Sequence, residues 1–302
     1  MPCLLLALLL RFALIFTVSS PILIHESLKR LKRDWQNGAR GARGFVLAAA
    51  GLAVIEGPEV VSLVELICFS GVNTTIIVEN AVEASILLSR ISKSCSSSPA
   101  SINVINQLTK RTNNKSLEEQ KMNHTEQLYH YRAFKLNSLA LACPYRETIY
   151  IDNDVTFRND TTTDIFFNRG FSAFDTKSDL SVGVAVATMC LRHSIEDLGV
   201  PDSFCQRQGG VLFLRCDRNA SNIMNDWNKT YHRYIDRDKH DQLSLRLILY
   251  RRQHELLNLP PALNCRHPCK DKYRDDCLLY HAHLTKDRRT ELDCFYSSSI
   301  SH

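Results

Sequence analysis

The hydrophobic positions in the first half of the chain alternate between the spacing of buried strands and that of amphipathic helices. Continuous apolar runs at residues 45–50 and 75–78 are typical of strands that are buried on both faces. Residues 81–91 and 132–143 instead place apolar side chains three and four positions apart, which predicts helices. Strands that alternate with helices form right-handed crossovers, so we expect an α/β protein with a mixed, mostly parallel sheet flanked by helices.

Other segments give shorter or weaker signals. A helix is expected at residues 58–69, after a loop of small residues, and a short strand at residues 102–105. The pattern changes after residue 154, and residues 166–174 are interpreted as an aromatic loop. Later strands are expected at residues 209–214 and 278–280, and later helices at residues 217–233 and 241–250.

Two carboxylates follow a buried strand that is expected at residues 148–151. Asp152 and Asp154 lie one residue apart, and the carboxyl end of a strand is where open α/β sheets bind their ligands. Two hard oxygen ligands held there suit Mn²⁺ or Mg²⁺ that carries a diphosphate. A second pair with the same spacing, Asp236 and Asp238, lies in a polar stretch that is typical of solvated surface, so only the first pair is a candidate site.

The composition is that of a globular protein with one large domain. The chain has 302 residues, of which 44% are hydrophobic and 23% charged, and its formal net charge is +5. Much of this charge lies at residues 25–43, and no basic cluster is interleaved with aromatic residues, so nucleic-acid binding is not expected. Residues 1–24 are interpreted as a signal peptide or membrane anchor, residues 25–43 as a basic stem or linker, and residues 44–302 as the domain.

Sequons and cysteines favour an oxidising, luminal compartment. Ten cysteines follow Cys3, and this even number suits several disulfides. A zinc site at Cys265, Cys269 and Cys277 is the alternative, but their spacing contains no standard pair of zinc ligands. We therefore expect a glycoprotein of the Golgi or ER lumen, either secreted or a type II membrane protein. Six Asn-x-Ser/Thr sequons begin at Asn73, Asn114, Asn123, Asn159, Asn219 and Asn228.

Several motifs follow one another in a recognisable order. They are Phe134-Lys135-Leu136, Pro144-Tyr145, the strand that ends in Asp152-Asn153-Asp154, Gly209-Gly210-Val211, Trp227, Asp241-Gln242, Leu259-Pro260-Pro261, Asn264, and the stretch from His281 to Lys286. This order resembles the donor-site core of GT-A fold nucleotide-diphospho-sugar transferases, a Rossmann-like fold with a single catalytic domain. The likeness extends from about residue 44 to residue 287 and is strongest to glycogenin-like retaining enzymes and fungal-type α-mannosyltransferases.

The resemblance implies how the donor and its metal ion would be bound. Asp152 and Asp154 would hold Mn²⁺ or Mg²⁺, with His281 or His283 as a third protein ligand. Lys286 would place a positive charge on the departing diphosphate.

The resemblance also implies contacts with the transferred sugar. Lys135 would reach the donor phosphate or sugar, and Asp241 would bind sugar hydroxyls. Gln242 would lie beside the anomeric carbon, and Gly209 and Gly210 would let the backbone approach the donor closely.

The implied activity is metal-dependent transfer of a hexose from a UDP- or GDP-hexose to a glycan or protein acceptor, with retention of configuration. The N-terminal segment would provide contact with a membrane. Three departures from the family pattern keep other functions open. Gln208-Gly209-Gly210 replaces an Asn-Ser-Gly type element, and the closing stretch lacks a glycine. The residues that contact the nucleotide base after the first strand are also not recognisable. The alternatives are a catalytically degenerate protein of the same fold and a secreted, disulfide-rich binding protein.

Overall fold

The computed structural model describes most of the expected domain. The described residues are 41–57, 60, 63–64, 71–94, 102–106, 124–141, 143–158, 163–177, 179–186, 198–201, 203–204, 207–237, 240–265 and 276–281. The expected leader, most of the expected stem, His283 and Lys286 lie outside these residues, as does most of the helix expected at residues 58–69. Among the described residues, no helix combines the length and the apolar character needed to cross a membrane.

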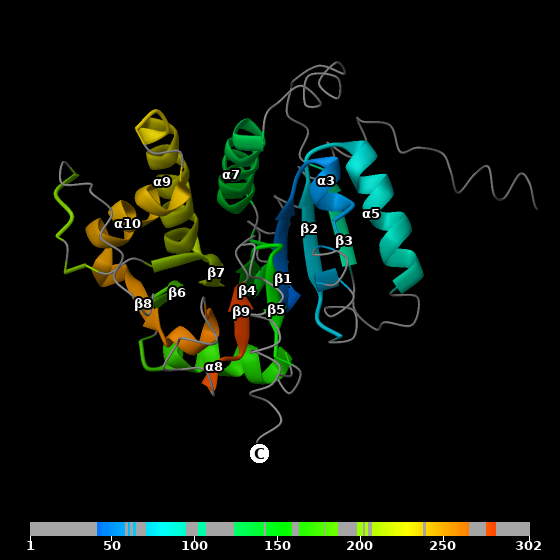
Figure 1. Ribbon diagram of the computed structural model, residues 1–302. Helices are drawn as coiled ribbons and strands as arrows, with labels where there is room; N and C mark the ends of the chain where they lie inside the picture. The colour runs from blue at the N-terminus through cyan, green and yellow to red at the C-terminus, as the bar shows by residue number, and fades with distance from the viewer. Residues whose placement is uncertain are drawn as a thin grey trace, which may run out of the picture.

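A seven-stranded mixed sheet forms the centre of the domain, in the order β3-β2-β1-β4-β7-β6-β8 (Figure 1). Strands β1 to β4 run parallel, as do β6 and β8, whereas β7 pairs antiparallel with both β4 and β6. The prediction of a mixed, mostly parallel sheet is therefore confirmed. The strands are β1 (Gly41–Ala49), β2 (Thr74–Val78), β3 (Ile102–Asn106), β4 (Tyr145–Ile151), β6 (Val182–Val186), β7 (Arg207–Arg215) and β8 (Leu256–Leu259).

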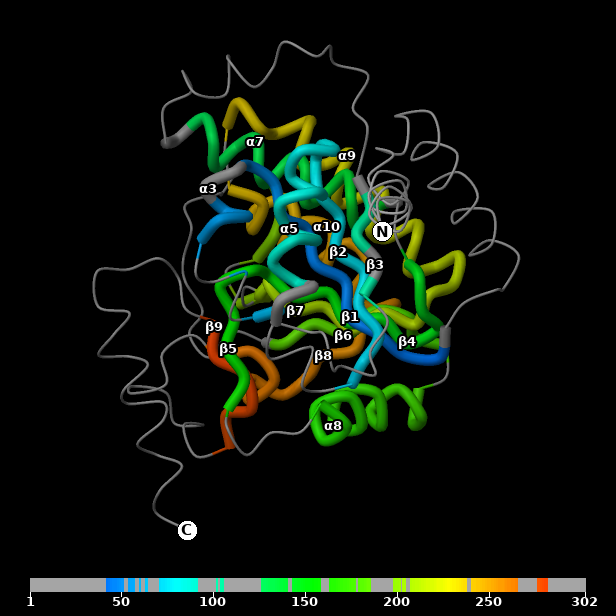
Figure 2. Tube along the Cα trace, turned by 90° about the vertical axis from the view of Figure 1, so that its right-hand side faces the viewer, coloured from blue at the N-terminus to red at the C-terminus, as the bar shows by residue number. Residues whose placement is uncertain are grey.

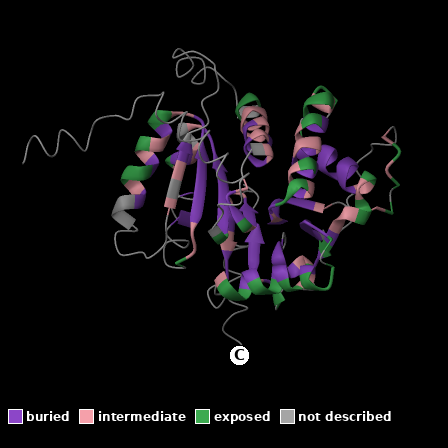
Figure 3. Cartoon of the chain, turned by 180° about the vertical axis from the view of Figure 1, so that it is seen from behind, coloured by how far each residue is buried: buried purple, intermediate pink, exposed green. Residues whose placement is uncertain are grey.

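Helices cover both faces of this sheet. One apolar cluster joins one face to α5 (Ala81–Ser94), α8 (Thr163–Asp175) and the short α3 (Leu52–Ile55). A second cluster joins the other face to α7 (His124–Leu141), α9 (Arg218–Tyr234) and α10 (Asp241–Arg251). Figure 3 shows the result, with buried strands inside and exposed residues on the outer faces of the helices. Trp227, which the sequence analysis also placed in the family motifs, is fully buried in the second cluster.

A separate two-stranded sheet brings the end of the described chain back to β4. Strand β5 (Val155–Phe157) follows Asp154 directly and pairs antiparallel with β9 (Leu279–His281). Figure 2 shows these two strands side by side. The register pairs Val155 with His281, so this short sheet carries a histidine to the carboxyl end of β4. A strand close to β9 was expected from the sequence, whereas β5 was not predicted.

The interpretation of residues 166–174 as a loop is wrong, because they lie in helix α8. Four phenylalanines of this helix are buried on the sheet, at spacings of one, four and three residues: Phe166, Phe167, Phe171 and Phe174. The helix contains Gly170 because a Cβ atom there would overlap the ring of Phe213 on β7. The many aromatic residues made the helical spacing of the apolar positions hard to recognise in the sequence. The positions that are buried in the structure make this spacing clear.

Two strands of the main sheet were also missed. Strands β6 and β8 have five and four residues, and they pair with each other in parallel at the edge of the sheet. Such short segments carry little periodicity of their own, so their strand character depends on tertiary pairing. In addition, α3 replaces part of the loop expected after the first strand, and β1 begins at Gly41, within the segment assigned to the stem.

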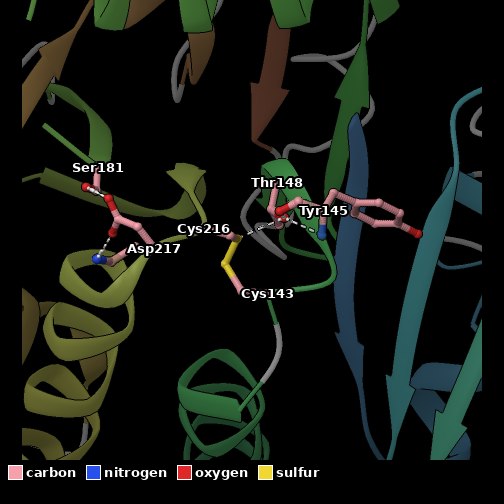
Figure 4. The surroundings of a disulfide bond; sticks show 7 residues. Cys143, Tyr145, Thr148, Ser181, Cys216 and Asp217 are labelled. Carbon is pink, nitrogen blue, oxygen red and sulfur yellow. Dashed lines mark hydrogen bonds between the residues drawn. A yellow bond between two sulfur atoms is a disulfide. The ribbon is translucent and has the colours of Figure 1, made fainter. Parts of the chain in front are cut away.

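Two disulfides are described, as expected for several of the cysteines. Cys143 follows α7 and is bonded to Cys216 at the end of β7, close to Thr148 of β4 (Figure 4). Next to it, the Asp217 carboxylate caps α9 by accepting a hydrogen bond from the amide of Ala220 at 2.8 Å. The other disulfide joins Cys265 to Cys277, which favours the disulfide interpretation over a zinc site for these two residues.

We predict that the Cys143–Cys216 disulfide contributes strongly to stability. Its loop spans 73 residues, and closing a loop of that length stabilises the folded state by about 4 kcal/mol because it constrains the unfolded chain. Replacing both cysteines with serine should therefore lower the free energy of unfolding by about 4 kcal/mol in urea titrations. The Cys265–Cys277 pair, separated by 12 residues, provides the comparison, and a larger loss from its double serine variant would contradict this account.

Candidate functional site

Three potential metal ligands converge at the carboxyl end of β4. Asp152 and Asp154 follow this strand, and His281 ends β9. The His281 Nε2 atom lies 3.1 Å from Asp154 Oδ1 and 3.8 Å from Asp152 Oδ2. One ligand atom from each residue can be chosen so that all three lie within 4.8 Å of one another. This combination of two carboxylates and one imidazole is a suitable protein ligand set for a divalent cation.

Gly210 leaves the space in which these ligands meet. It lies on β7 opposite the end of β4, where its carbonyl oxygen accepts a hydrogen bond from the Asp152 amide at 2.8 Å. A Cβ atom on Gly210 would overlap the His281 ring and come within 2.9 Å of Asp152 Oδ2. On Gly209, a Cβ atom would lie 2.9 Å from the Leu245 side chain. Both glycines are thus required by close packing of the site residues themselves.

Lys135 joins two carboxylates that come from different parts of the chain. Its Nζ atom lies 3.0 Å from Asp152 Oδ1 and 3.2 Å from Asp241 Oδ2. The lysine side chain is only 3% exposed, on the inner side of α7, and Asp241 is the first residue of α10. Besides the contact with the donor that is expected of it, Lys135 thus forms a buried ion bridge. This bridge joins α7, the end of β4 and α10.

The charges in this bridge shift the pKa values of Lys135 and Asp241. Burial alone would lower the pKa of Lys135, but the negative charges of Asp152 and Asp241 outweigh it and raise that pKa above the ordinary lysine value. Burial alone would raise the pKa of Asp241, but the positive charges of Lys135 and Arg132 outweigh it and lower that pKa below its ordinary value. Lys135 and Asp241 are therefore both charged at neutral pH.

Aromatic rings surround the lysine ammonium. The Lys135 Nζ atom lies 5.3 Å from the centroid of the Tyr150 ring and 5.7 Å from that of Trp227. The Trp227 indole in turn donates a hydrogen bond to the backbone oxygen of Asp241 at 3.1 Å, and the Tyr150 hydroxyl donates one to the Asp152 carboxylate. Tyr150 was not among the predicted site residues, although it precedes Asp152 by two positions and a strand places such residues on one face.

Buried amide groups without a hydrogen-bond partner occur next to the cluster. Both amide atoms of Asn264, the Asn153 Oδ1 atom and the Gln208 Oε1 atom are buried and have no hydrogen-bond partner among the described residues. Asn153 separates the two aspartates, Gln208 precedes Gly210 by two residues, and Asn264 precedes a residue whose carbonyl bonds the amide of His281. Because an unsatisfied buried polar group is costly, these amides are candidates to bind a polar ligand.

The remaining candidates have mixed outcomes. Gln242 is half-buried in the first turn of α10, next to Asp241, so the two lie together as the motif implied. His283 and Lys286 lie outside the described residues. Of the second aspartate pair, Asp236 lies on an exposed turn after α9, which agrees with its interpretation as surface, and Asp238 is not among the described residues.

Comparison with known proteins identifies the fold. Neither a known protein-family model nor a curated protein matches the chain. The apo structure of the bifunctional glycosyltransferase WbbM is similar with a TM-score of 0.52 and 12% identity, over 84% of this chain and 50% of that one. At this level of identity the likeness shows the fold alone, and the chain spans about half the length of WbbM. Together with the sheet order, it shows that the expected GT-A fold is correct.

Two other solved structures have lower TM-scores. GlyE, a glycosyltransferase of Streptococcus pneumoniae TIGR4, is similar with a TM-score of 0.48 and 12% identity, over 84% of this chain and 60% of that one. The galactosyltransferase LgtC, solved with donor and acceptor sugar analogues, has a TM-score of 0.48 and 11% identity, over 84% of this chain and 95% of that one.

We predict that removing the Lys135 ammonium destabilises the protein. A Lys135→Met variant removes the cation that lies between Asp152 and Asp241, and breaking a buried ion pair in this way costs about 3 kcal/mol or more. The free energy of unfolding in urea should fall by about that amount. The exposed Lys177→Met variant provides the control and should change little. A stability of Lys135→Met equal to that of the wild type would contradict the bridge.

His281 is predicted to make the stability of the metal-free protein depend on pH. Burial lowers the pKa of His281, but the charges of Asp154 and Asp152 outweigh it, and the net pKa is raised above its ordinary value. The stabilisation that His281 provides is thus complete below about pH 6.5 and is lost as the pH rises through its raised folded pKa.

Urea unfolding with a chelator, at several pH values, measures this effect. The stability difference between the wild type and His281→Asn should shrink as the pH rises above about 6.5. The exposed His254→Asn variant serves as the control. A difference that instead grows with pH would show that the sign assigned to His281 is wrong.

Proposed function

We propose that this protein is a metal-dependent glycosyltransferase that moves a hexose from a UDP- or GDP-hexose to a glycan or protein acceptor. One observation carries the proposal: Asp152, Asp154 and His281 bring ligand atoms within 4.8 Å of one another at the carboxyl edge of a GT-A sheet. Ligands bind at this edge in open α/β folds, and carboxylates there suit a cation that accompanies a diphosphate.

Asp152, Asp154 and His281 would hold Mn²⁺ as the resident cofactor. When bound, the ion supplies positive charge that neutralises the diphosphate of the donor and favours its departure. Mn²⁺ is our choice over Mg²⁺ because one of the three ligands is an imidazole nitrogen, which the harder Mg²⁺ accepts less readily.

Lys135 would fix the geometry in which the donor is bound. Its ammonium lies 3.0 Å from Asp152 and 3.2 Å from Asp241, so it holds one metal ligand and one sugar-binding carboxylate at a set separation. Through these two contacts, Lys135 would link the metal site to the sugar-binding site. This link accounts for a buried ammonium group at this position despite the free-energy cost of removing it from water. Lys135 thereby has a positioning role as well as the donor contact that the family resemblance implies.

Asp241 would bind hydroxyl groups of the transferred sugar. Its lowered pKa keeps it ionised, which makes it a good hydrogen-bond acceptor for hydroxyls but a weak general base at neutral pH. We therefore infer that the departing diphosphate takes the proton of the acceptor hydroxyl, which is compatible with transfer with retention. Gln242, the next residue of α10, would lie beside the anomeric carbon.

A luminal location follows from the same proposal. The Cys143–Cys216 and Cys265–Cys277 disulfides suit the oxidising lumen of the ER or Golgi, and the sequons and the apolar N-terminal residues are consistent with entry into that compartment. We propose that the protein is secreted or held there by its N-terminal segment.

A catalytically degenerate descendant of the fold is the second candidate. Gln208 occupies the position of the family asparagine, and within the described part of the chain its buried Oε1 atom has no hydrogen-bond partner. If this substitution has abolished donor binding, the cluster would persist as a remnant without affinity for nucleotides.

Nucleotide binding distinguishes these two candidates. The full chain, folded oxidatively, should show a higher melting temperature with UDP or GDP only when Mn²⁺ is present, because ligands that bind the native state stabilise it. A ligand at 100 times its Kd contributes about 2.7 kcal/mol, which for a protein of this size shifts the midpoint by several degrees.

Variants locate this binding. Asp152→Asn and Asp154→Asn should each abolish the Mn²⁺-dependent shift, whereas Asp236→Asn in the exposed second pair should retain it. If all three variants lost the Mn²⁺-dependent shift in melting temperature, or if none did, the assignment of the metal site to Asp152 and Asp154 would be contradicted. A well-folded wild-type protein that shows no shift with any nucleotide would favour the degenerate descendant.

A further inference from the structure

Tyr131 extends from α7 to the turn that carries the two aspartates of the metal cluster. It precedes Lys135 by four residues, and residues four apart lie on the same face of a helix. The Lys135 Nζ atom contacts Asp152, and the Tyr131 hydroxyl accepts a hydrogen bond from Asn153 Nδ2 at 3.2 Å. One face of α7 therefore contacts two consecutive residues of this turn.

The turn lies between two strands and outside the pairing of either. Strand β4 ends just before Asp152, and β5 begins just after Asp154, so the hydrogen-bonded registers of both strands leave out residues 152–154. Asn153 separates the two candidate metal ligands. Its hydrogen bond to Tyr131 therefore restrains the part of the chain on which the spacing of the two carboxylates depends.

The Asn153 amide is shielded from water. The residue is only 8% exposed, and its Oδ1 atom has no hydrogen-bond partner among the described residues. Within that part of the chain, the bond from Nδ2 to Tyr131 is thus the one that orients the amide. Because water is largely excluded, it cannot readily replace this bond when the tyrosine hydroxyl is removed.

The Tyr131 hydroxyl is itself held by the neighbouring strand. It donates a hydrogen bond at 3.2 Å to the backbone oxygen of Ala48, near the end of β1, and the tyrosine packs against the second apolar cluster. Tyr131 also interacts with Tyr150, whose hydroxyl donates to the Asp152 carboxylate. Tyr131 thus connects the turn with β1, which is paired with β4 in the sheet.

We propose that Tyr131 is a positioning residue of the metal site, which holds the turn from Asp152 to Asp154 so that both carboxylates face the ion. It acts through Asn153 and contacts neither the ion nor the donor. Removing an outer group that orients metal ligands lowers metal affinity by about 10- to 100-fold. This inference rests on the proposed metal-dependent function and assigns a further residue to it.

The affinity for Mn²⁺ without nucleotide measures this role. The full chain, folded oxidatively, is titrated with Mn²⁺, and the free ion is followed by electron paramagnetic resonance. Tyr131→Phe removes only the hydroxyl and should raise the Kd for Mn²⁺ at least about tenfold. Tyr250→Phe is the matched control, because Tyr250 is also half-buried on a helix and lies nine residues beyond Asp241 on α10. An unchanged Kd in Tyr131→Phe would overturn the proposal.

Asn153→Ala tests whether Tyr131 acts through Asn153. It should also raise the Kd for Mn²⁺ at least about tenfold. The double variant should bind Mn²⁺ no more weakly than the weaker of the two single variants, because both substitutions remove the same contact. Effects that multiply in the double variant would show independent action and overturn the proposal. If Tyr131→Phe does not fold, Asn153→Ala decides, and an unchanged Kd in that variant overturns the proposal.

Excess Mn²⁺ distinguishes positioning of the metal ligands from direct contact with the donor. When Mn²⁺ is far above the raised Kd, Tyr131→Phe should show the same rise in melting temperature with UDP or GDP as the wild type. A smaller rise under these conditions would show that Tyr131 contacts the nucleotide, which overturns the positioning role alone. A well-folded wild-type protein that does not bind Mn²⁺ would instead overturn the proposed function, and this inference with it.

Discussion

The arrangement of the site depends on one buried cation. Lys135 extends from α7 between the carboxylates of Asp152 and Asp241, with its ammonium 3.0 Å and 3.2 Å from their oxygens. Without that charge, two carboxylates from β4 and α10 would repel each other in a poorly solvated space. The same ammonium lies over the rings of Tyr150 and Trp227, so it also joins the polar site to the apolar core beneath it.

Covalent and steric constraints hold this bridge in place. Cys143, which follows α7, is bonded to Cys216 at the end of β7, so α7 and β7 are joined at the end of the sheet opposite the metal cluster. At the cluster itself, Gly210 allows β7 to pass close to Asp152 and His281. The helix that supplies Lys135 is therefore anchored at both ends of β4, by a disulfide and by ion pairs.

The spacing of apolar residues was sufficient to predict those helices and strands in which that spacing is regular. Strand β4, which ends just before Asp152, and helix α10, which begins at Asp241, both follow apolar patterns of recognisable length. The motifs also placed Lys135 in the same site. Helix α8 was missed because its four phenylalanines drew attention to aromatic content, although all four lie at buried positions with helical spacing. Strands β6 and β8 were missed because their pairing partners, not their own residues, define them.

Contacts between distant segments were beyond the reach of sequence patterns. The motif resemblance suggested that His281 or His283 completes the cluster, but only the pairing of β5 with β9 places His281 beside Asp154. Likewise, no local signal indicates that Lys135 binds both Asp152 and Asp241.

The central claim is that Asp152, Asp154 and His281 form a divalent cation site that holds a nucleoside diphosphate. The most direct test is an anomalous difference map from crystals grown with Mn²⁺ and UDP or GDP, recorded at the manganese edge. The account predicts one peak within coordinating distance of all three side chains, with the diphosphate of the nucleotide bound to the same ion. A bound nucleotide elsewhere on the sheet, or crystals with manganese at other residues only, would contradict it.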